Sequence, residues 1–315
     1  IAGGAESLSN VPILHSRGFS DALVAASKAK TLSARVQAFA KIRAKDFIPI
    51  TPAIAEPTTG ESMGQSAEKM AKLNGVTREE QDALALASHL NAAKGTADGR
   101  LTAEIVPVMV PPKFEFAMTT DNGIRADTTA EALAALKPVF DRRYGSVTAG
   151  NASPLTDGGA AVLLMSEEAA KAAGLKPKAY IRGYAYAALD PGEQLLQAPV
   201  LAAPMALKRA GLTLKDMDLV EMHEAFAAQV LSNLRGFESQ YWAERAGFSS
   251  PVGTVDRSKL NVMGGSVSIG HPFGATGARI TTTLVNELER RGGQFGLMTV
   301  CAAGGLGFAM VVERA

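Results

Sequence analysis

Short apolar runs and longer amphipathic segments follow each other through the second half of the chain. Short apolar runs bounded by glycine or polar residues are typical of buried strands, and they lie at 160–165, 178–187, 219–222, 297–301 and 308–313. Apolar residues at helical spacing predict helices at 167–173, 202–210, 224–235 and 275–291. Strands that alternate with helices predict a layered α/β fold.

The first half of the chain is less regular, and prolines interrupt it at positions 49, 52 and 57. Helices are expected at 62–73 and 77–95. The second of these begins with a capping box, because Thr77 is followed three residues later by Glu80. A strand is predicted at residues 104–110.

A basic helix is predicted within residues 19–47. Four apolar residues recur there at helical spacing: Leu32, Val36, Phe39 and Ile42. Six basic residues surround them, namely Lys28, Lys30, Arg35, Lys41, Arg43 and Lys45. Two interpretations stay open. The helix is either an ordinary solvated face or a surface for an anionic membrane, an acyl-CoA phosphate or a partner protein.

Composition narrows the classes of protein. The chain has 315 residues, 47% of them hydrophobic and 20% charged, which describes an ordinary globular protein with a sizeable core. A formal net charge of +1 gives no general electrostatic reason to bind nucleic acid. No apolar run reaches transmembrane length. A single cysteine excludes an internal disulfide framework and predicts a reducing compartment, the cytoplasm.

Reactive residue types stand at three junctions between predicted elements, where layered α/β proteins bind ligands. His223 follows a predicted strand and precedes small residues that leave room for a ligand. His271 stands in a glycine-rich loop before a helix, a setting suited to a hydrogen-bond donor or general base. Cys301 ends a strand and precedes a turn of alanine and glycine.

Cys301 has two interpretations that the residues alone leave open. A free cysteine at the end of a strand is commonly a small buried hydrophobe. The small residues at 302–305 instead leave space and free backbone N–H groups beside the sulfur. A nearby histidine would then lower the pKa of the thiol toward neutrality.

A zinc site is not expected, because one cysteine and four scattered histidines lack ligand spacing. A serine-hydrolase elbow is also absent from the sequence.

Taken together, these segments resemble the thiolase family of acyl-CoA acyltransferases. Four stretches occur in the family's order: "VTAGNASPLTDGGAAVLLM", "HEAFAAQ", "GGSVSIGHPFGATGAR" and "CAAGGLGFAMVVE". The opening "AGGAESLSNVP" and "MGQSAE" at 63–68 also fit, so the resemblance covers the whole chain. It implies an α/β fold with αβαβα layers, formed by two similar half-domains with an inserted loop domain. By the resemblance, residues 1–13 and 154–175 belong to the first half-domain, which is incomplete, 14–153 to the loop domain and 176–315 to the second half-domain.

The resemblance also implies a mechanism, in which a 3-oxoacyl-CoA is cleaved by CoA or formed by the reverse Claisen condensation. Cys301 matches the cysteine that moves the proton on the acetyl-CoA carbon. His271 matches the histidine that activates the acyl-accepting cysteine and donates to the thioester oxygen, and His223 matches the position that holds a water in that oxyanion hole. The backbone N–H of Ala303 matches a donor of the other hole. Further positions match the CoA site: Ser153, Ala225, Phe226, Met63 and Gly304.

Several positions depart from the common thiolase pattern. Asparagine is commonest where His223 stands, and the histidine form resembles the trifunctional-complex β subunits of fatty-acid β-oxidation. Glycine is frequent where Ala302–Ala303 stand, and a histidine often occupies the position of Ser62, which leaves one CoA contact open. The family's nucleophilic cysteine precedes "AGGAES". We therefore expect the sequence to be a fragment that cannot form the acyl-enzyme by itself.

Alternative functions are a decarboxylating 3-oxoacyl synthase of the same fold and a non-catalytic remnant that binds or scaffolds acyl-CoA. Cys301 counts against the synthase, since those enzymes need no cysteine at this place. The resemblance implies coenzyme A as a substrate, no separate cofactor and no metal. It also implies a homodimer or tetramer, and a hydratase/dehydrogenase α subunit as a candidate partner. Residues 28–45 are then the expected docking or peripheral membrane surface.

Overall fold

The computed structural model describes residues 1–50 and 54–315. Contacts within the chain divide it into two compact units. Unit 1 comprises Ile1–Ser7 and Ala55–Ala315, and unit 2 comprises Leu8–Ile54. Each unit is described by itself. The predicted domain boundaries near residues 13, 153 and 175 stay a prediction.

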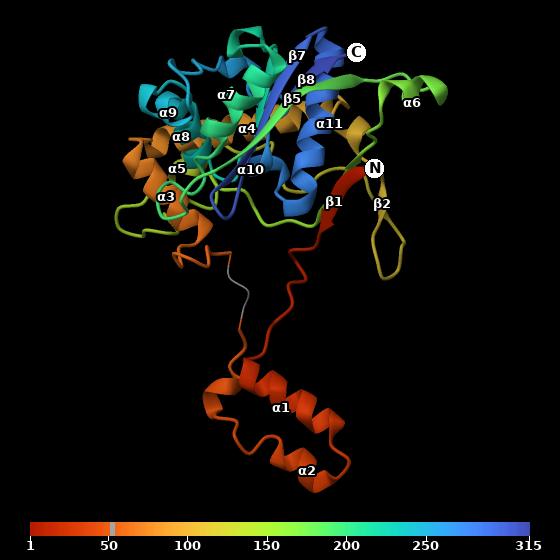
Figure 1. Cartoon of the computed structure of the whole chain (residues 1–315), viewed down its shortest axis with the longest axis vertical. Helices are drawn as coiled ribbons and strands as arrows, with labels where there is room; N and C mark the ends of the chain where they lie inside the picture. The colour runs from red at the N-terminus through yellow and green to blue at the C-terminus, as the bar shows by residue number, and fades with distance from the viewer. Residues whose placement is uncertain (51–53) are drawn as a thin grey trace. The chain divides into compact units, whose positions relative to one another are not determined.

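A four-stranded sheet forms the centre of the C-terminal part of unit 1 (Figure 1). Its strands, in spatial order, are β5 (Ala179–Ala188), β8 (Leu306–Arg314), β7 (Phe295–Ala302) and β6 (Leu219–Met222). Strands β6 and β7 are parallel, and the other neighbours are antiparallel. Because β6 and β7 run in the same direction, their carboxyl ends lie at one edge of the sheet, and the residues that follow them meet there.

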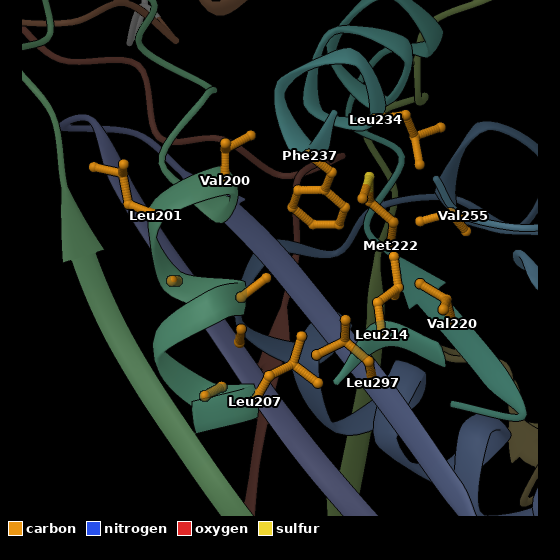
Figure 2. Packing of buried hydrophobic residues seen from close by; sticks show 14 of the residues in the cluster. Val200, Leu201, Leu207, Leu214, Val220, Met222, Leu234, Phe237, Val255 and Leu297 are labelled. Carbon is orange, nitrogen blue, oxygen red and sulfur yellow. The ribbon is translucent and has the colours of Figure 1, made fainter. Parts of the chain in front are cut away.

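Helices cover both faces of this sheet. Successive side chains of a strand point to opposite faces, and Leu297 and Met298 of β7 accordingly belong to different core clusters. Leu297 packs with helix α7 (Pro199–Ala210), and Figure 2 shows the Leu297 side chain across from Leu207 of that helix. Met298 packs instead with Leu284 of helix α11 (Phe273–Arg291). The side chains of β7 thus contribute alternately to an apolar layer under α7 and to another under α11.

Further helices surround the sheet and its connections. They are α3 (Met63–Leu73), α4 (Arg78–Ala97), α5 (Ala130–Ala134), α6 (Glu167–Ala172), α8 (Ala227–Phe237), α9 (Gln240–Arg245) and α10 (Ser266–Ile269). Short 3₁₀ turns lie at Thr102–Glu104, Leu214–Asp216 and Arg257–Lys259. The capping box predicted for Thr77 and Glu80 is confirmed at the start of α4. Phe237 of α8 packs beside Met222 in the core (Figure 2).

Two smaller sheets complete unit 1. Strand β1 (Ala2–Glu6) pairs antiparallel with β4 (Gly158–Val162), and both contact α11. Strand β2 (Val108–Met109) forms a short ladder with β3 (Ala117–Met118). In the part of the chain that the structure describes, no helix is both long and apolar enough to cross a membrane.

The prediction of a strand over 104–110 is wrong for most of its length. Residues Thr102–Glu104 form a 3₁₀ turn, and only Val108–Met109 pair as a strand. Pro107 interrupts this apolar run, and it has no N–H to donate to a neighbouring strand. The helix predicted at 224–235 begins three residues later, at Ala227. Phe226 is held extended there because it bridges to Ala152.

Unit 2 contains helix α1 (Arg17–Lys28), helix α2 (Leu32–Gln37) and a 3₁₀ turn at Ala44–Phe47. The single basic helix predicted for this region is therefore wrong. Thr31 begins a new helix, since its hydroxyl accepts a hydrogen bond from the Ala34 amide at 3.2 Å. The chain bends back, and the ring of Phe19 packs against Phe39 and Phe47.

A glycine in β8 allows the sheet to approach the start of α7. A Cβ on Gly307 would lie 2.4 Å from the carbonyl carbon of Ala198, which is backbone and cannot rotate away. We expect Gly307→Ala to lower the free energy of unfolding by roughly 1–3 kcal/mol, because α7 must move from the sheet. Urea unfolding followed by circular dichroism measures this. The control is Gly277→Ala in α11, where nothing lies within 4 Å of the new Cβ. Equal loss of stability in both variants would contradict the packing argument.

Candidate active site

His223 lies directly beyond strand β6. Its backbone N–H donates to the Thr299 carbonyl of β7 at 2.9 Å, so the parallel ladder continues one residue past the strand and fixes the position of the ring. The side chain is 1% exposed. Its Nδ1 is 3.0 Å from Ser266 Oγ. Its Nε2 is buried and has no hydrogen-bond partner among the residues that the structure describes.

His271 lies in the loop between α10 and α11. Its backbone N–H donates to the Pro154 carbonyl at 3.3 Å, and the residue bridges to Leu155. Its Nδ1 is 2.7 Å from Thr276 Oγ1 of α11. The rings of His271 and His223 are 4.1 Å apart between centroids, with planes inclined by 48°. The structure therefore brings together two predicted histidines that lie 48 positions apart in the sequence.

Both imidazoles are neutral at physiological pH. Burial lowers the pKa of His223 well below its usual value, and the neighbouring His271 and Arg279 lower it further. Burial, with a contribution from Arg279, lowers the pKa of His271 to about 4. A neutral imidazole has one N–H donor and one acceptor nitrogen. Each ring is therefore suited to donate to a developing oxyanion, and His271 also to accept a proton.

Cys301 stands near the end of β7, where it pairs with Gly307 of β8. The side chain is 4% exposed and lies in an apolar cluster. Burial raises the pKa of the thiol to about 12, and the prediction that a nearby histidine would lower this pKa is therefore wrong. The physical reason is that both histidines of the site are neutral and supply no positive charge that would stabilise a thiolate.

Three residues predicted to line the CoA site belong to the same apolar cluster as Cys301 or pack against it. Met63, Ala225 and Phe226 pack in the same cluster as the cysteine. The Ser153 amide donates to the Ala225 carbonyl at 2.9 Å, so the loop carrying this serine is joined to the segment that follows His223. The structure thus groups the predicted positions from α3, the loop before β4 and the loop after β6. Their roles in binding CoA stay a prediction.

The turn after Cys301 has a partner that sequence reasoning missed. The amide of Gly304 donates to Oε2 of Glu56 at 3.1 Å. Glu56 is 4% exposed, and its other oxygen accepts from the amide and hydroxyl of Thr58 at 3.2 and 2.8 Å. The Gly304 amide is thus not free, contrary to the prediction for this turn. No pattern in the sequence links Glu56 to residue 304, because the contact spans 248 positions.

A buried carboxylate beside His223 was also missed. Glu224 accepts hydrogen bonds from Ser88 Oγ at 2.7 Å, Asn261 Nδ2 at 2.7 Å and the Val267 amide at 3.2 Å. Burial raises its pKa, and these hydrogen bonds oppose that rise. Each donor comes from a different segment, so the carboxylate joins α4 and the start of α10 to the end of β6. Among the described residues, no group of three or more His, Cys, Asp and Glu side chains could hold a metal ion.

Comparison with known proteins places this arrangement in a family. The profile "Thiolase, N-terminal domain" matches residues 1–168, and "Thiolase, C-terminal domain" matches residues 175–314. Proteins named 3-ketoacyl-CoA thiolase from Yersinia enterocolitica and Yersinia pestis are each 52% identical over 314 residues, covering 99% of this chain and 72% of the relative. The chain belongs to the thiolase family.

Solved structures agree with this assignment. An acetyl-CoA acetyltransferase from Bacillus anthracis superposes with a TM-score of 0.78 at 36% identity, covering 99% of this chain and 71% of the other. Human mitochondrial 3-ketoacyl-CoA thiolase in complex with CoA superposes with a TM-score of 0.77 at 34% identity, covering 99% and 70%. The α/β thiolase fold predicted from the sequence motifs is confirmed.

The raised pKa of Cys301 predicts slow alkylation in the folded protein. A thiol with a pKa of about 12 holds about a thousandfold less thiolate at pH 8 than an ordinary cysteine. We expect the rate of reaction with iodoacetamide to rise about tenfold per pH unit between pH 7 and 10, without a plateau. Intact-mass measurements report this residue alone, since it is the only cysteine. The urea-unfolded chain is the control and should plateau near pH 9. A plateau below pH 8 in the folded chain would contradict a raised pKa.

Proposed function

We propose that this chain carries the proton-transfer and oxyanion-binding part of a 3-oxoacyl-CoA thiolase site. The observation that carries the proposal is the contact between the rings of His223 and His271, 4.1 Å apart, one at the end of β6 and the other in the loop before α11. Claisen chemistry develops negative charge on oxygen, and donors fixed on rigid loops stabilise it. The names of the relatives support thiolysis as the reaction.

The two histidines act on the thioester oxygen in this proposal. His271 donates to that oxygen and takes the proton of the acyl-accepting thiol, which its neutral state permits. His223 holds a water that faces the same oxygen. Because the His223 ring is buried and the His271 ring is half-buried, each hydrogen bond to the developing charge is stronger than it would be at the surface.

Cys301 acts as the acid that protonates the acetyl-CoA carbon when the carbon–carbon bond breaks. Its thiol keeps its proton at neutral pH, which is the form that this step needs. The Ala303 amide, two residues further on, donates to the oxygen on the 3-carbon, which becomes negative when the acyl-accepting thiolate adds to the 3-oxo group. Cys301 is the only cysteine and holds the proton-moving position, so the acyl-accepting thiolate is not assigned to this chain.

Coenzyme A and acyl-CoA are the proposed ligands, supported by the human thiolase described in complex with CoA. The histidine form of the motif at 223–229 supports a degradative role in fatty-acid β-oxidation. We also propose a cytoplasmic location and a homodimer or tetramer, with a hydratase/dehydrogenase α subunit as partner. The matches name thiolases, so neither the synthase nor the scaffolding alternative gains support.

Acetoacetyl-CoA thiolysis tests the proposed roles. In the enzyme isolated from its source, we expect Cys301→Ala to lower kcat by roughly 10³-fold, because the enolate loses its proton donor. The 315-residue chain alone should give neither turnover nor an acyl adduct by intact mass. Lys171→Ala, in an exposed part of α6, is the control and should leave kcat unchanged. Wild-type kcat in the Cys301 variant, or turnover by the 315-residue chain, would reject these assignments.

Unit 2 is the proposed docking surface. Its helix α2 exposes Leu32 and Val36 by 76% and 68%, and these residues line a groove of about 790 Å³ with Phe39 and neighbouring small and polar side chains. Basic residues at 41, 43 and 45 follow the groove in the sequence. Exposed apolar side chains beside positive charge suit an anionic membrane or an acidic partner surface.

Charge reversal tests this surface. Replacing Lys41, Arg43 and Lys45 by Glu should reduce co-sedimentation with phosphatidylserine-containing vesicles at low salt by at least tenfold, since each basic residue near such a surface contributes about 1 kcal/mol. The control reverses three exposed lysines of unit 1, namely Lys113, Lys137 and Lys176. A pull-down with the hydratase/dehydrogenase α subunit shows whether the surface binds this protein partner or an anionic membrane. Unchanged binding in both assays would reject the docking role.

A further inference from the structure

Ser266, the first residue of α10, is fully buried between two nitrogen-bearing side chains. Its Oγ is 2.8 Å from Nη2 of Arg279, which comes from α11. The same Oγ is 3.0 Å from Nδ1 of His223, beyond β6. These are the hydrogen bonds of the Ser266 hydroxyl among the residues that the structure describes. The hydroxyl therefore connects a cation to a histidine of the candidate site.

The identity of these neighbours decides where the hydroxyl proton lies. A guanidinium donates hydrogen bonds and accepts none, so Arg279 occupies a lone pair of the serine oxygen. The hydroxyl has one proton left to donate, and Nδ1 of His223 is the acceptor within reach. If Nδ1 carried a proton instead, the buried O–H would face two donors and lose its hydrogen bond. An unsatisfied buried hydroxyl costs on the order of 1–3 kcal/mol, enough to favour one arrangement strongly.

We propose that Ser266 and Arg279 are positioning residues that hold His223 as the neutral tautomer with its proton on Nε2. The Nε2–H is then the donor that the ring presents beside His271, and it is the buried nitrogen without a partner in the described part of the chain. The opposite tautomer would present a lone pair at Nε2 and could not donate to the water that faces the developing oxyanion. This inference rests on the proposed function for the catalytic meaning of the donor, but the tautomer itself follows from the contacts alone.

Arg279 is half-buried, and its Nη2 donates to Ser266. Burial lowers the pKa of the guanidinium, and the nearby carboxyl groups of Glu221, Glu224 and Asp121 oppose that decrease. A cation on the far side of Ser266 polarises the hydroxyl and strengthens its donation to Nδ1. The same positive charge disfavours protonation of His223, so the ring stays neutral while its tautomer is set.

The tautomer is measured directly by two-bond ¹H–¹⁵N NMR of the 315-residue chain with ¹⁵N-labelled histidine. We expect the His223 signals to show a protonated Nε2 and an unprotonated Nδ1 across pH 6–8. Ser266→Ala should shift the Nδ1 resonance and mix the tautomers, whereas Ser266→Thr should restore the wild-type pattern because it keeps the hydroxyl. Ser268→Ala is the matched control, since this buried serine of α10 contacts Ser88 and the Gly265 carbonyl. A protonated Nδ1 in the wild type, or an unchanged pattern in Ser266→Ala, would overturn the inference.

Kinetics of the enzyme isolated from its source give a second measurement. We expect Ser266→Ala to lower kcat for acetoacetyl-CoA thiolysis at least tenfold with KM changed less than threefold, because donation strengthens in the transition state. Ser266→Thr should recover kcat to within threefold, and Ser268→Ala should match the wild type. A wild-type enzyme without thiolysis would refute the proposed function while the NMR result still decides the tautomer. Equal kcat in Ser266→Ala and wild type would overturn the positioning role.

Discussion

The buried carboxylate of Glu224 is the constraint on which the candidate site depends. Burying a carboxylate is unfavourable unless its oxygens accept hydrogen bonds, so α4, Asn261 and the start of α10 must close on it together. Residue 265 must be glycine for this closure, since a Cβ there would lie 2.3 Å from the Glu224 carboxyl carbon. His223 precedes Glu224 in the sequence, and Ser266 lies between Gly265 and Val267. Closure around the Glu224 carboxylate therefore places His223 and Ser266 within hydrogen-bonding distance of each other.

Burial keeps the reactive groups of the site, His223, His271 and Cys301, uncharged before substrate binds. Burial lowers the pKa of both histidines and raises that of Cys301. In a polar, exposed site the same groups would exchange protons with water. Here proton transfer has to involve the substrate, and charge that appears on a thioester or enolate oxygen meets fixed donors in a low-dielectric setting. The environment that makes Cys301 a poor nucleophile makes it a suitable acid.

The strands at 219–222, 297–301 and 308–313 were predictable from sequence because buried strands have a local signature. Motif order also predicted the meeting of His223 with His271. Contacts without a local signature were not predictable, among them the hydrogen bonds of Glu56 to Gly304 and of Arg279 to Ser266. The pKa of Cys301 was mispredicted for a related reason. The sequence does not show that burial leaves both histidines neutral, and burial of the thiol itself raises its pKa.

A histidine at position 223 requires support that asparagine, the commonest residue there in thiolases, does not. An asparagine amide presents its N–H₂ donor by rotating about its last side-chain bond. A buried imidazole between fixed partners presents a donor only if the proton resides on the correct nitrogen, and rotation cannot move it. A neighbouring group must therefore donate a hydrogen bond to Nδ1, so that the proton of the ring resides on Nε2. Serine alone could donate or accept, and Arg279 removes that ambiguity by donating to its oxygen. The positive charge of Arg279 thus acts on an oxyanion through two intervening side chains, Ser266 and His223. Because the guanidinium can only donate to the serine oxygen, it determines which nitrogen of His223 carries the proton.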